Sequence, residues 1–148
     1  MNIAIVEDNP ANADILKEHI SRFASENHII MNTFVFSNGF NFLKSYTPAW
    51  DLILMDIEMP HMNGIETARK IREKDSEVLI MFITQMAQYA IDGYSVNAID
   101  YILKPVNYYA FSLKLKHILH LLAGRQTSSI VISNQSGKFR IPLNTLLY

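Results

Sequence analysis

The chain has 148 residues, of which 49% are hydrophobic and 18% are charged, and its formal net charge is −1. This length accommodates one domain of ordinary size plus a short additional segment, and the apolar fraction is ample for a core. The sequence contains no cysteine, which excludes disulfides, thiolate metal sites and cysteine nucleophiles.

The charge is distributed unevenly. Residues 1–124 carry ten Lys and Arg against fourteen Asp and Glu, a net charge of −4, whereas residues 125–148 carry three basic residues and no acid. The first part is unsuited to binding nucleic acid by charge, and the last part belongs compositionally to another unit. The longest apolar run, Val78 to Ile83, is far shorter than the ~20 residues of a membrane span, and no signal-peptide pattern is present. We therefore expect a cytoplasmic protein without membrane contact.

Short apolar runs alternate with helical patterns through the first 122 residues. The runs are continuously apolar, as in parallel strands buried on both faces, and Asn9-Pro10 is a helix-start signal. Strands are predicted at 2–6, 29–36, 51–55, 78–83 and 99–103, and helices at 11–25, 39–45, 65–74, 87–94 and 107–122. Five successive βα units predict an α/β fold with a doubly wound parallel sheet.

The last part of the sequence breaks this alternation. Residues 124–129 are typical of a linker, and the pattern after them predicts a β-hairpin over residues 130–142. A lone hairpin is at best marginally stable in water. We therefore interpret residues 130–148 as the beginning of a second domain that is cut off after its first strands.

Charged side chains stand where the predicted strands end. Glu7 and Asp8 follow the first strand, Asp56 follows the third, and Lys104 follows the fifth. The carboxyl ends of parallel strands meet at one edge of an open sheet, which is where such sheets bind ligands. Burying an unpaired charge is costly, so these groups need partners. Three acids and a lysine at this edge predict a metal-assisted phosphoryl site.

In this order, the strand-end residues resemble the receiver domain of two-component response regulators. The matching residues are Glu7-Asp8, the segment Asp56 to Pro60, Asn63-Gly64, Thr84, Tyr101 and Lys104-Pro105. The match covers residues 1–122. It implies a flavodoxin-like, doubly wound sheet of five parallel strands in the order 2-1-3-4-5, with five helices, to which the C-terminal β-hairpin remnant would be added.

The resemblance assigns chemistry to the strand-end residues. Asp56 would accept a phosphoryl group from a sensor histidine kinase, and Lys104 would pair with the phosphoryl oxygens. Mg²⁺ would be the cofactor, held by the carboxylates of Asp8 and Asp56, by Glu7 directly or through water, and by the main-chain carbonyl of Glu58. The bond between Lys104 and Pro105 would be cis, as is typical of the family.

The resemblance also implies a switch rather than an enzyme, one that catalyses only its own phosphotransfer and dephosphorylation. Thr84 would bind the phosphoryl group through its hydroxyl, and Tyr101 would turn inward in response. The change would alter the face formed by residues 86–118, through which a homodimer would form.

A narrower resemblance concerns the LytTR class of regulators. It is carried by residues 82–94 and 97–105, and residues 130–148 resemble the opening strands of a LytTR DNA-binding domain. It implies a receiver domain over residues 1–123, a linker over 124–129, and a DNA-binding domain of which most is missing here. The expected output is DNA binding that regulates transcription.

Three other hypotheses remain open at this point. An aspartyl-nucleophile phosphatase usually has a second aspartate two residues after the nucleophile, where this chain has Glu58. A flavin- or nucleotide-binding module would need a glycine-rich loop after the first strand, where Glu7 and Asp8 would instead repel a phosphate. A receiver-like scaffold that is never phosphorylated is disfavoured by the intact residue set.

A zinc site at His117 and His120 lacks a third ligand.

Overall fold

The computed structural model describes the backbone of residues 1–135 and the side chains of residues 1–88 and 92–125. The chain forms two compact units, of which the first is Met1–Ser112 and the second begins at Leu113. The first unit contains the whole sheet and most of the helices. None of the described helices combines the length and the apolar character that crossing a bilayer requires.

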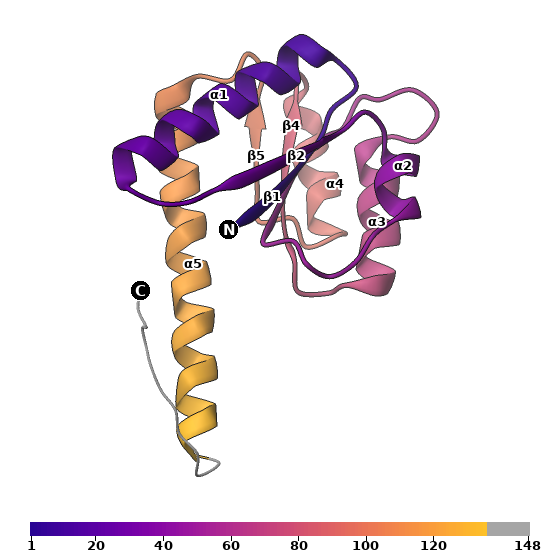
Figure 1. Cartoon of the computed structure of the whole chain (residues 1–148). Helices are drawn as coiled ribbons and strands as arrows, with labels where there is room; N and C mark the ends of the chain where they lie inside the picture. Colours follow the sequence, from indigo (N-terminus) through magenta and orange to yellow (C-terminus); the bar gives the residue numbers. More distant parts are fainter. Residues whose placement is uncertain (136–148) are drawn as a thin grey trace. The chain divides into compact units, whose positions relative to one another are not determined.

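Five parallel strands form one sheet in the order β2-β1-β3-β4-β5 (Figure 1). This confirms the predicted fold class and strand order. The strands are β1 (Asn2–Val6), β2 (Asn32–Phe36), β3 (Leu52–Asp56), β4 (Leu79–Thr84) and β5 (Asp100–Leu103). They begin and end within three residues of the predicted positions, because continuous apolar runs bounded by polar residues mark buried strands clearly.

The helices connect successive strands. They are α1 (Pro10–Asn27), α2 (Gly39–Lys44), α3 (Gly64–Lys74), α4 (Ala90–Tyr94), which follows a 3-10 turn η1 (Ala87–Tyr89), and α5 (Tyr108–Gln135). Asn9 caps α1 by accepting from the Asn12 backbone N–H, and Pro10 stands in the first turn, as predicted. In α3, Asn63 and Glu66 form a reciprocal capping box, which fixes where the helix begins.

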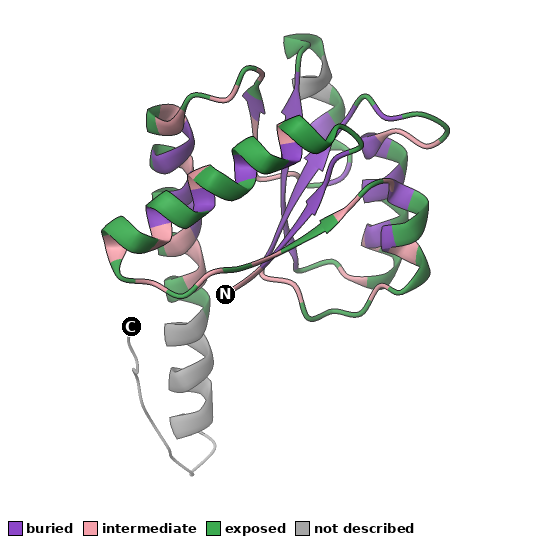
Figure 2. Ribbon diagram, turned by 45° about the horizontal axis from the view of Figure 1, so that its top comes forward, coloured by how far each residue is buried: buried purple, intermediate pink, exposed green. Residues whose placement is uncertain are grey.

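The sheet is buried on both faces because successive side chains of a strand point to opposite sides. Ala4 and Val6 of β1 and Ile53 and Met55 of β3 belong to the core cluster that includes buried residues of α2 and α3. Alternate residues of the same strands, such as Ile3 and Leu54, are equally buried on the other side. Figure 2 shows the buried stripe of α1 turned toward the sheet.

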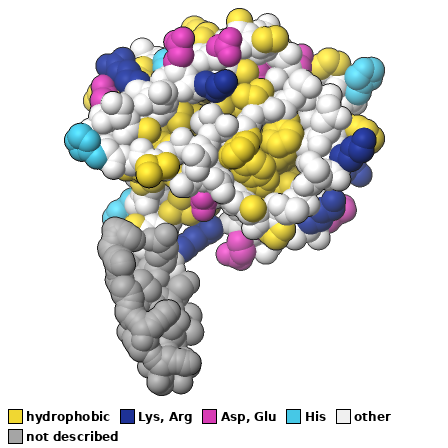
Figure 3. All heavy atoms as spheres, in the orientation of Figure 1, with side chains coloured by type: hydrophobic (Ala, Val, Ile, Leu, Met, Phe, Trp, Pro, Cys, Tyr) yellow, Lys and Arg dark blue, Asp and Glu magenta, His cyan; other side chains and the backbone are white. Residues whose placement is uncertain are grey.

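The edge strand β2 is the least buried strand. Phe34 is 48% exposed and packs edge-on against Trp50, with ring centroids 5.3 Å apart. Val35 and Phe40 are also exposed, and apolar side chains gather at the surface around β2 and α2 (Figure 3). An edge strand has a neighbour on one side only, which explains its lower burial relative to β1 and β3.

The structure corrects the prediction for the segment after residue 122. Helix α5 begins where expected but continues to Gln135, so the predicted linker 124–129 and the first part of the predicted hairpin, residues 130–135, are helical. No proline stands in this stretch, and one glycine, Gly124, costs a helix only about 1 kcal/mol. A short apolar run such as residues 130–132 fits a helix or a strand equally well. The rest of the predicted hairpin lies outside the described residues.

Candidate functional site

The parallel register brings the predicted site residues to one edge of the sheet. Val6 pairs with Met55, so Glu7 and Asp56, the residues after them, lie next to each other at the ends of β1 and β3. Asp56 in turn pairs with Ile83, and Thr84 pairs with Leu103, the residue before Lys104. The site is therefore a direct product of strand order and register, as expected for an open parallel sheet.

Glu7, Asp8 and Asp56 form an acidic cluster. Each offers one carboxylate oxygen, and these three atoms lie within 4.8 Å of one another. Glu7 and Asp56 are only 3% and 2% exposed, whereas Asp8 is exposed. Hard oxygen ligands at this spacing fit Mg²⁺, which prefers a few carboxylates and retains several waters. Within the described part of the chain no other such acidic or histidine cluster occurs, and His117 and His120 are both exposed.

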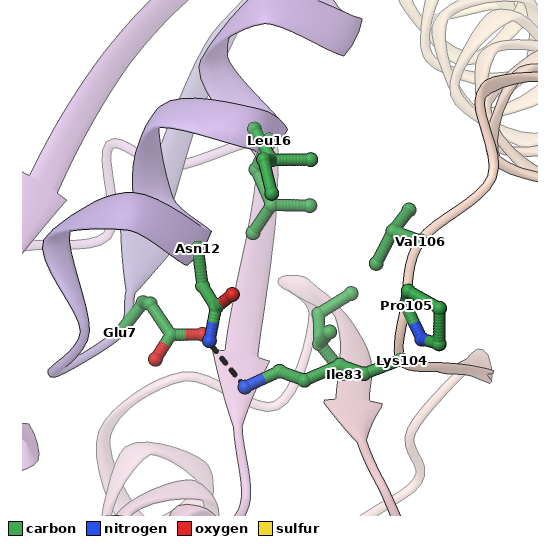
Figure 4. A pocket seen from close by; sticks show the side chains of 8 residues that line it. Glu7, Asn12, Leu16, Ile83, Lys104, Pro105 and Val106 are labelled. Atoms are coloured by element: carbon green, nitrogen blue, oxygen red, sulfur yellow. Dashed lines mark ion pairs between the residues drawn. The ribbon is translucent and has the colours of Figure 1, made fainter.

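Lys104 joins the two buried acids. Its Nζ lies 3.0 Å from Glu7 Oε1 and 3.2 Å from Asp56 Oδ1, and its side chain is largely buried. The other Glu7 oxygen, Oε2, accepts the backbone N–H of Asn9 at the start of α1. Figure 4 shows the Lys104 side chain extending from the end of β5 toward Glu7. The ammonium can thus exchange its contacts with the two carboxylates for contacts with an anion bound beside them.

The environment shifts the pKa values of this charged group of side chains. Burial, followed by the negative charge of Glu7, raises the pKa of Asp56 from 3.8 to about 7, although Lys104 acts in the opposite direction. Burial alone would lower the pKa of Lys104, but its hydrogen bond to Glu7 and the charges of Asp56 and Glu7 raise it. Lys104 therefore remains protonated, while Asp56 changes its charge near neutral pH.

Thr84 and Tyr101 lie on the neighbouring strands β4 and β5. Thr84 is fully buried, and its hydroxyl oxygen accepts the Met86 backbone N–H at 3.1 Å. Its carbonyl accepts the backbone N–H of Lys104 at 2.8 Å, which ties the lysine to the end of β4. Tyr101 is half-buried and borders a cavity of about 130 Å³ that Phe82 also lines.

The loop after β3 holds the main chain of Asp56 in place. Gly64 donates its N–H to the Ile57 carbonyl at 2.9 Å, and a Cβ on Gly64 would lie only 2.3 Å from the Asp56 carbonyl oxygen. Gly64, which belongs to the residues that carry the family resemblance, is therefore a close-packing position. Glu58 is exposed in this loop. The bond between Lys104 and Pro105 is cis, as the resemblance implied.

A small pocket beside the acids contains residues that the sequence did not single out. It encloses about 50 Å³ and is lined by Glu7 and Lys104 together with Asn12 and Leu16 of α1 and Val106 beyond β5 (Figure 4). Asn12 stands in the first turn of α1, a place that the Asn9-Pro10 signal could have indicated. Nothing in the local sequence pairs α1 with residues 105–106, because their contact depends on the folded sheet.

Comparison with known proteins gives a consistent family. The family model of the response regulator receiver domain matches residues 3–116. The sensory transduction protein LytT of Oceanobacillus iheyensis is 34% identical over 88 residues, covering 58% of this chain and 35% of LytT. The transcriptional regulatory protein NatR of Bacillus subtilis is 31% identical over 128 residues, covering 86% of this chain and 53% of NatR. The chain thus spans about half or less of the length of these two relatives.

Solved structures show the same fold. The response regulator TrrA from Thermotoga maritima, in complex with Mg²⁺ and BeF, is 30% identical, with a TM-score of 0.67 and coverage of 79% of this chain and 97% of that chain. The N-terminal domain of a response regulator/sensory box/GGDEF 3-domain protein from Carboxydothermus hydrogenoformans has a TM-score of 0.71 at 25% identity, covering 84% and 98%. Since the family model matches well over half of its residues, the chain belongs to the response regulator receiver domain family of two-component systems.

Proposed function

We propose that Asp56 is the phospho-acceptor of this receiver domain and that a sensor histidine kinase is its donor. The observation that carries the proposal is the position of Asp56, which is buried beside Glu7 and Asp8 with its Oδ1 3.2 Å from the Lys104 ammonium. A carboxylate that repels phosphate by its own charge accepts a phosphoryl group only where cations neutralise it. The acids around Asp56 could hold a metal cation, and Lys104 supplies an ammonium.

The proposed transfer requires little covalent work from the protein. A carboxylate oxygen of Asp56 attacks the phosphorus of a phosphohistidine, the new O–P bond forms as the N–P bond breaks, and the imidazole keeps the electron pair. Mg²⁺, held by Glu7, Asp8, Asp56 and the Glu58 main-chain carbonyl, would neutralise oxygen charge in this step. Lys104 exchanges its contacts with the carboxylates for phosphoryl oxygens. Hydrolysis of the acyl phosphate resets the switch.

Thr84 and Tyr101 would report phosphorylation to the rest of the protein. Thr84 is buried at the end of β4, and its hydroxyl oxygen accepts the Met86 N–H, so the hydroxyl proton would be donated to a phosphoryl oxygen. Tyr101, half-buried on the neighbouring strand β5, would turn inward in response. A single new charged ligand then biases a two-state equilibrium. The change would alter the face formed by residues 86–118, and we propose that a homodimer forms through this face.

We further place the chain in the LytTR class, with a receiver domain over residues 1–123 and the start of a DNA-binding domain over 130–148, joined through residues 124–129, which form part of α5. The similarity to LytT supports the LytTR class, and the similarity to the transcriptional regulatory protein NatR supports an output in transcription. The output is DNA binding and transcription regulation. The protein acts in the cytoplasm, because it must meet both the kinase that phosphorylates it and the promoter DNA there.

The deciding experiment is intact-mass analysis after incubation with acetyl phosphate and Mg²⁺. The wild type should gain one phosphoryl group, and Asp56→Ala should gain none. An unmodified wild type, or equal labelling of the variant, would exclude Asp56 as the acceptor. Many turnovers on small phosphate esters would instead favour a phosphatase of the aspartyl-nucleophile kind.

A further inference from the structure

We propose that His19, on α1, is a positioning residue for Lys104. His19 anchors the main chain just beyond the lysine and thereby sets where the ammonium stands relative to Glu7 and Asp56. The proposal rests on the phospho-acceptor function of Asp56. It concerns a residue outside the acidic cluster and outside the Thr84–Tyr101 pair.

The central contact is a hydrogen bond between distant parts of the sequence. His19 Nε2 lies 2.9 Å from the carbonyl oxygen of Val106, two residues after Lys104. A carbonyl oxygen accepts and cannot donate, so the imidazole carries its proton on Nε2 and donates it. The contact is partly buried, and such a bond is stronger and more costly to break than one at the surface.

The imidazole ring is also held by packing. Its centroid lies 5.5 Å from that of Tyr108, at an interplanar angle of 59°, and 5.8 Å from that of Phe111, at 38°. Both aromatic residues stand in the first turn of α5, and Phe111 is fully buried. Centroid separations of this size are typical of stabilising aromatic pairs. The ring therefore has little freedom, and its Nε2 stays directed at the Val106 carbonyl.

A second set of contacts joins the same two elements further along α1. The Tyr108 hydroxyl donates to Glu26 Oε1 at 2.6 Å, and the Arg22 guanidinium lies 3.9 Å from the centre of the Tyr108 ring. Arg22 also pairs with Glu26 Oε2 at 3.1 Å. The Arg22 and Glu26 side chains are exposed at the surface, where ion pairs contribute little stability. Their effect is to keep Tyr108 in place against His19.

These contacts matter for Lys104 because its main chain is fixed on both sides. On one side, the Lys104 N–H donates to the Thr84 carbonyl on β4. On the other side, His19 of α1 holds the Val106 carbonyl, and Pro105 between the two residues has no N–H to donate. The ammonium contacts both acids at once, at 3.0 and 3.2 Å, so a shift of the main chain that carries it would alter the two contacts together.

Helix α1 is suited to this role because it follows directly after Glu7 and Asp8. His19 thus links the helix that follows Glu7 and Asp8 to the segment that carries Lys104. A displacement of about 1 Å at a reacting group can cost about a hundredfold in rate. The alternative is that His19 merely fills space, in which case a leucine of similar volume would replace it without consequence for the site.

The test compares His19→Leu, which keeps apolar packing but cannot donate, with His19→Gln, whose amide restores a donor. The same substitution at an exposed histidine of α5, His120→Leu, is the matched control. Each variant is measured for Mg²⁺ affinity, for beryllium fluoride affinity at saturating Mg²⁺, and for the rate of labelling by acetyl phosphate. Thermal melting confirms that each variant is folded at the assay temperature.

We expect His19→Leu to bind beryllium fluoride about ten- to a hundredfold more weakly and to be labelled correspondingly more slowly, with Mg²⁺ affinity unchanged. His19→Gln should recover most of the loss, and His120→Leu should resemble the wild type. Wild-type behaviour of His19→Leu, or equal losses in the leucine and glutamine variants, would overturn the role. Failure of the wild type itself to bind beryllium fluoride would instead remove the phospho-acceptor function, so the two failures are distinguishable.

Discussion

The ammonium of Lys104 stands between two buried carboxylates, 3.0 Å from Glu7 Oε1 and 3.2 Å from Asp56 Oδ1. One positive charge therefore compensates two negative ones, and the exposed carboxylate of Asp8 adds a third nearby. The site carries an excess of negative charge at an edge of the sheet where Glu7 and Asp56 are buried. Both the raised pKa of Asp56 and the expected attraction for a divalent cation follow from this imbalance.

Asp56→Asn is expected to stabilise the metal-free protein above neutral pH. Because burial and Glu7 raise the pKa of Asp56 from 3.8 to about 7, the folded state binds this proton more tightly than the unfolded state. Its contribution to stability is therefore present at low pH and is lost as the pH rises toward about 7. In EDTA, the advantage of Asp56→Asn in urea unfolding should grow by on the order of 2 kcal/mol between pH 5.5 and pH 8.

The control for this measurement is Asp14→Asn, at an exposed position of α1. It removes the same charge without a buried environment, so its effect on the unfolding free energy should be small at both pH values. A stability difference between Asp56→Asn and the wild type that does not change with pH would contradict the assignment.

Mg²⁺ affinity is expected to fall as the pH drops below about 7. The metal needs the ionised Asp56 carboxylate, and a proton on that group competes with it. Well below this pKa, affinity should weaken about tenfold for each pH unit, as for competition with one proton. Isothermal titration calorimetry from pH 5.5 to pH 8.5 would measure the profile. Asp8→Asn should lower the affinity throughout but keep the same pH dependence, and a flat wild-type profile would refute the prediction.

Lys104→Ala is expected to retain Mg²⁺ binding while losing affinity for a phosphoryl mimic. The lysine pairs with oxygens of the acids rather than serving as a metal ligand, and its charge lowers the pKa of Asp56. Removing it should shift the midpoint of the Mg²⁺ pH profile upward and weaken beryllium fluoride binding by at least about tenfold. Lys17→Ala, an exposed position on α1, is the control. Loss of Mg²⁺ affinity at pH 8.5 would argue against this role.

Gly64→Ala is expected to destabilise the protein and disturb the site together. The added Cβ would lie 2.3 Å from the Asp56 carbonyl oxygen and 2.9 Å from the Ile57 Cα, both main-chain atoms that can yield only by moving the loop. Overpacking of this kind typically costs about 1–3 kcal/mol. Urea unfolding and Mg²⁺ titration would measure the two effects.

Gly93→Ala offers a matched comparison in α4. Its added Cβ would meet the nearest atom, Ala98 Cβ, at 3.5 Å, which is ordinary van der Waals contact. Alanine is favoured over glycine inside a helix by about 1 kcal/mol, so this variant should be as stable as the wild type or more stable. Equal stability losses at the two glycines would show that the close approach of Gly64 to Asp56 is unimportant.

Much of the fold was predictable from local sequence patterns. Apolar runs such as Leu52 to Met55 predicted buried parallel strands, and Asn9-Pro10 predicted the start of α1. The strand order came from the resemblance, and the structure confirms it. Local patterns failed after residue 122, where the run Ile130 to Ile132 predicted a strand and the structure has helix. Periodicity cannot separate helix from strand over so few residues.

The sequence by itself determined the chemistry at the strand ends: Glu7, Asp8, Asp56 and Lys104 stand there because local patterns end the strands at those residues. The tertiary structure alone decided which charges meet. Register across β1, β3 and β5 brings Lys104 within reach of Glu7 and Asp56, and packing of α1 places His19 against Val106. The end of a strand is determined by residues next to it in the sequence, whereas a contact between distant residues depends on the arrangement of the elements that carry them.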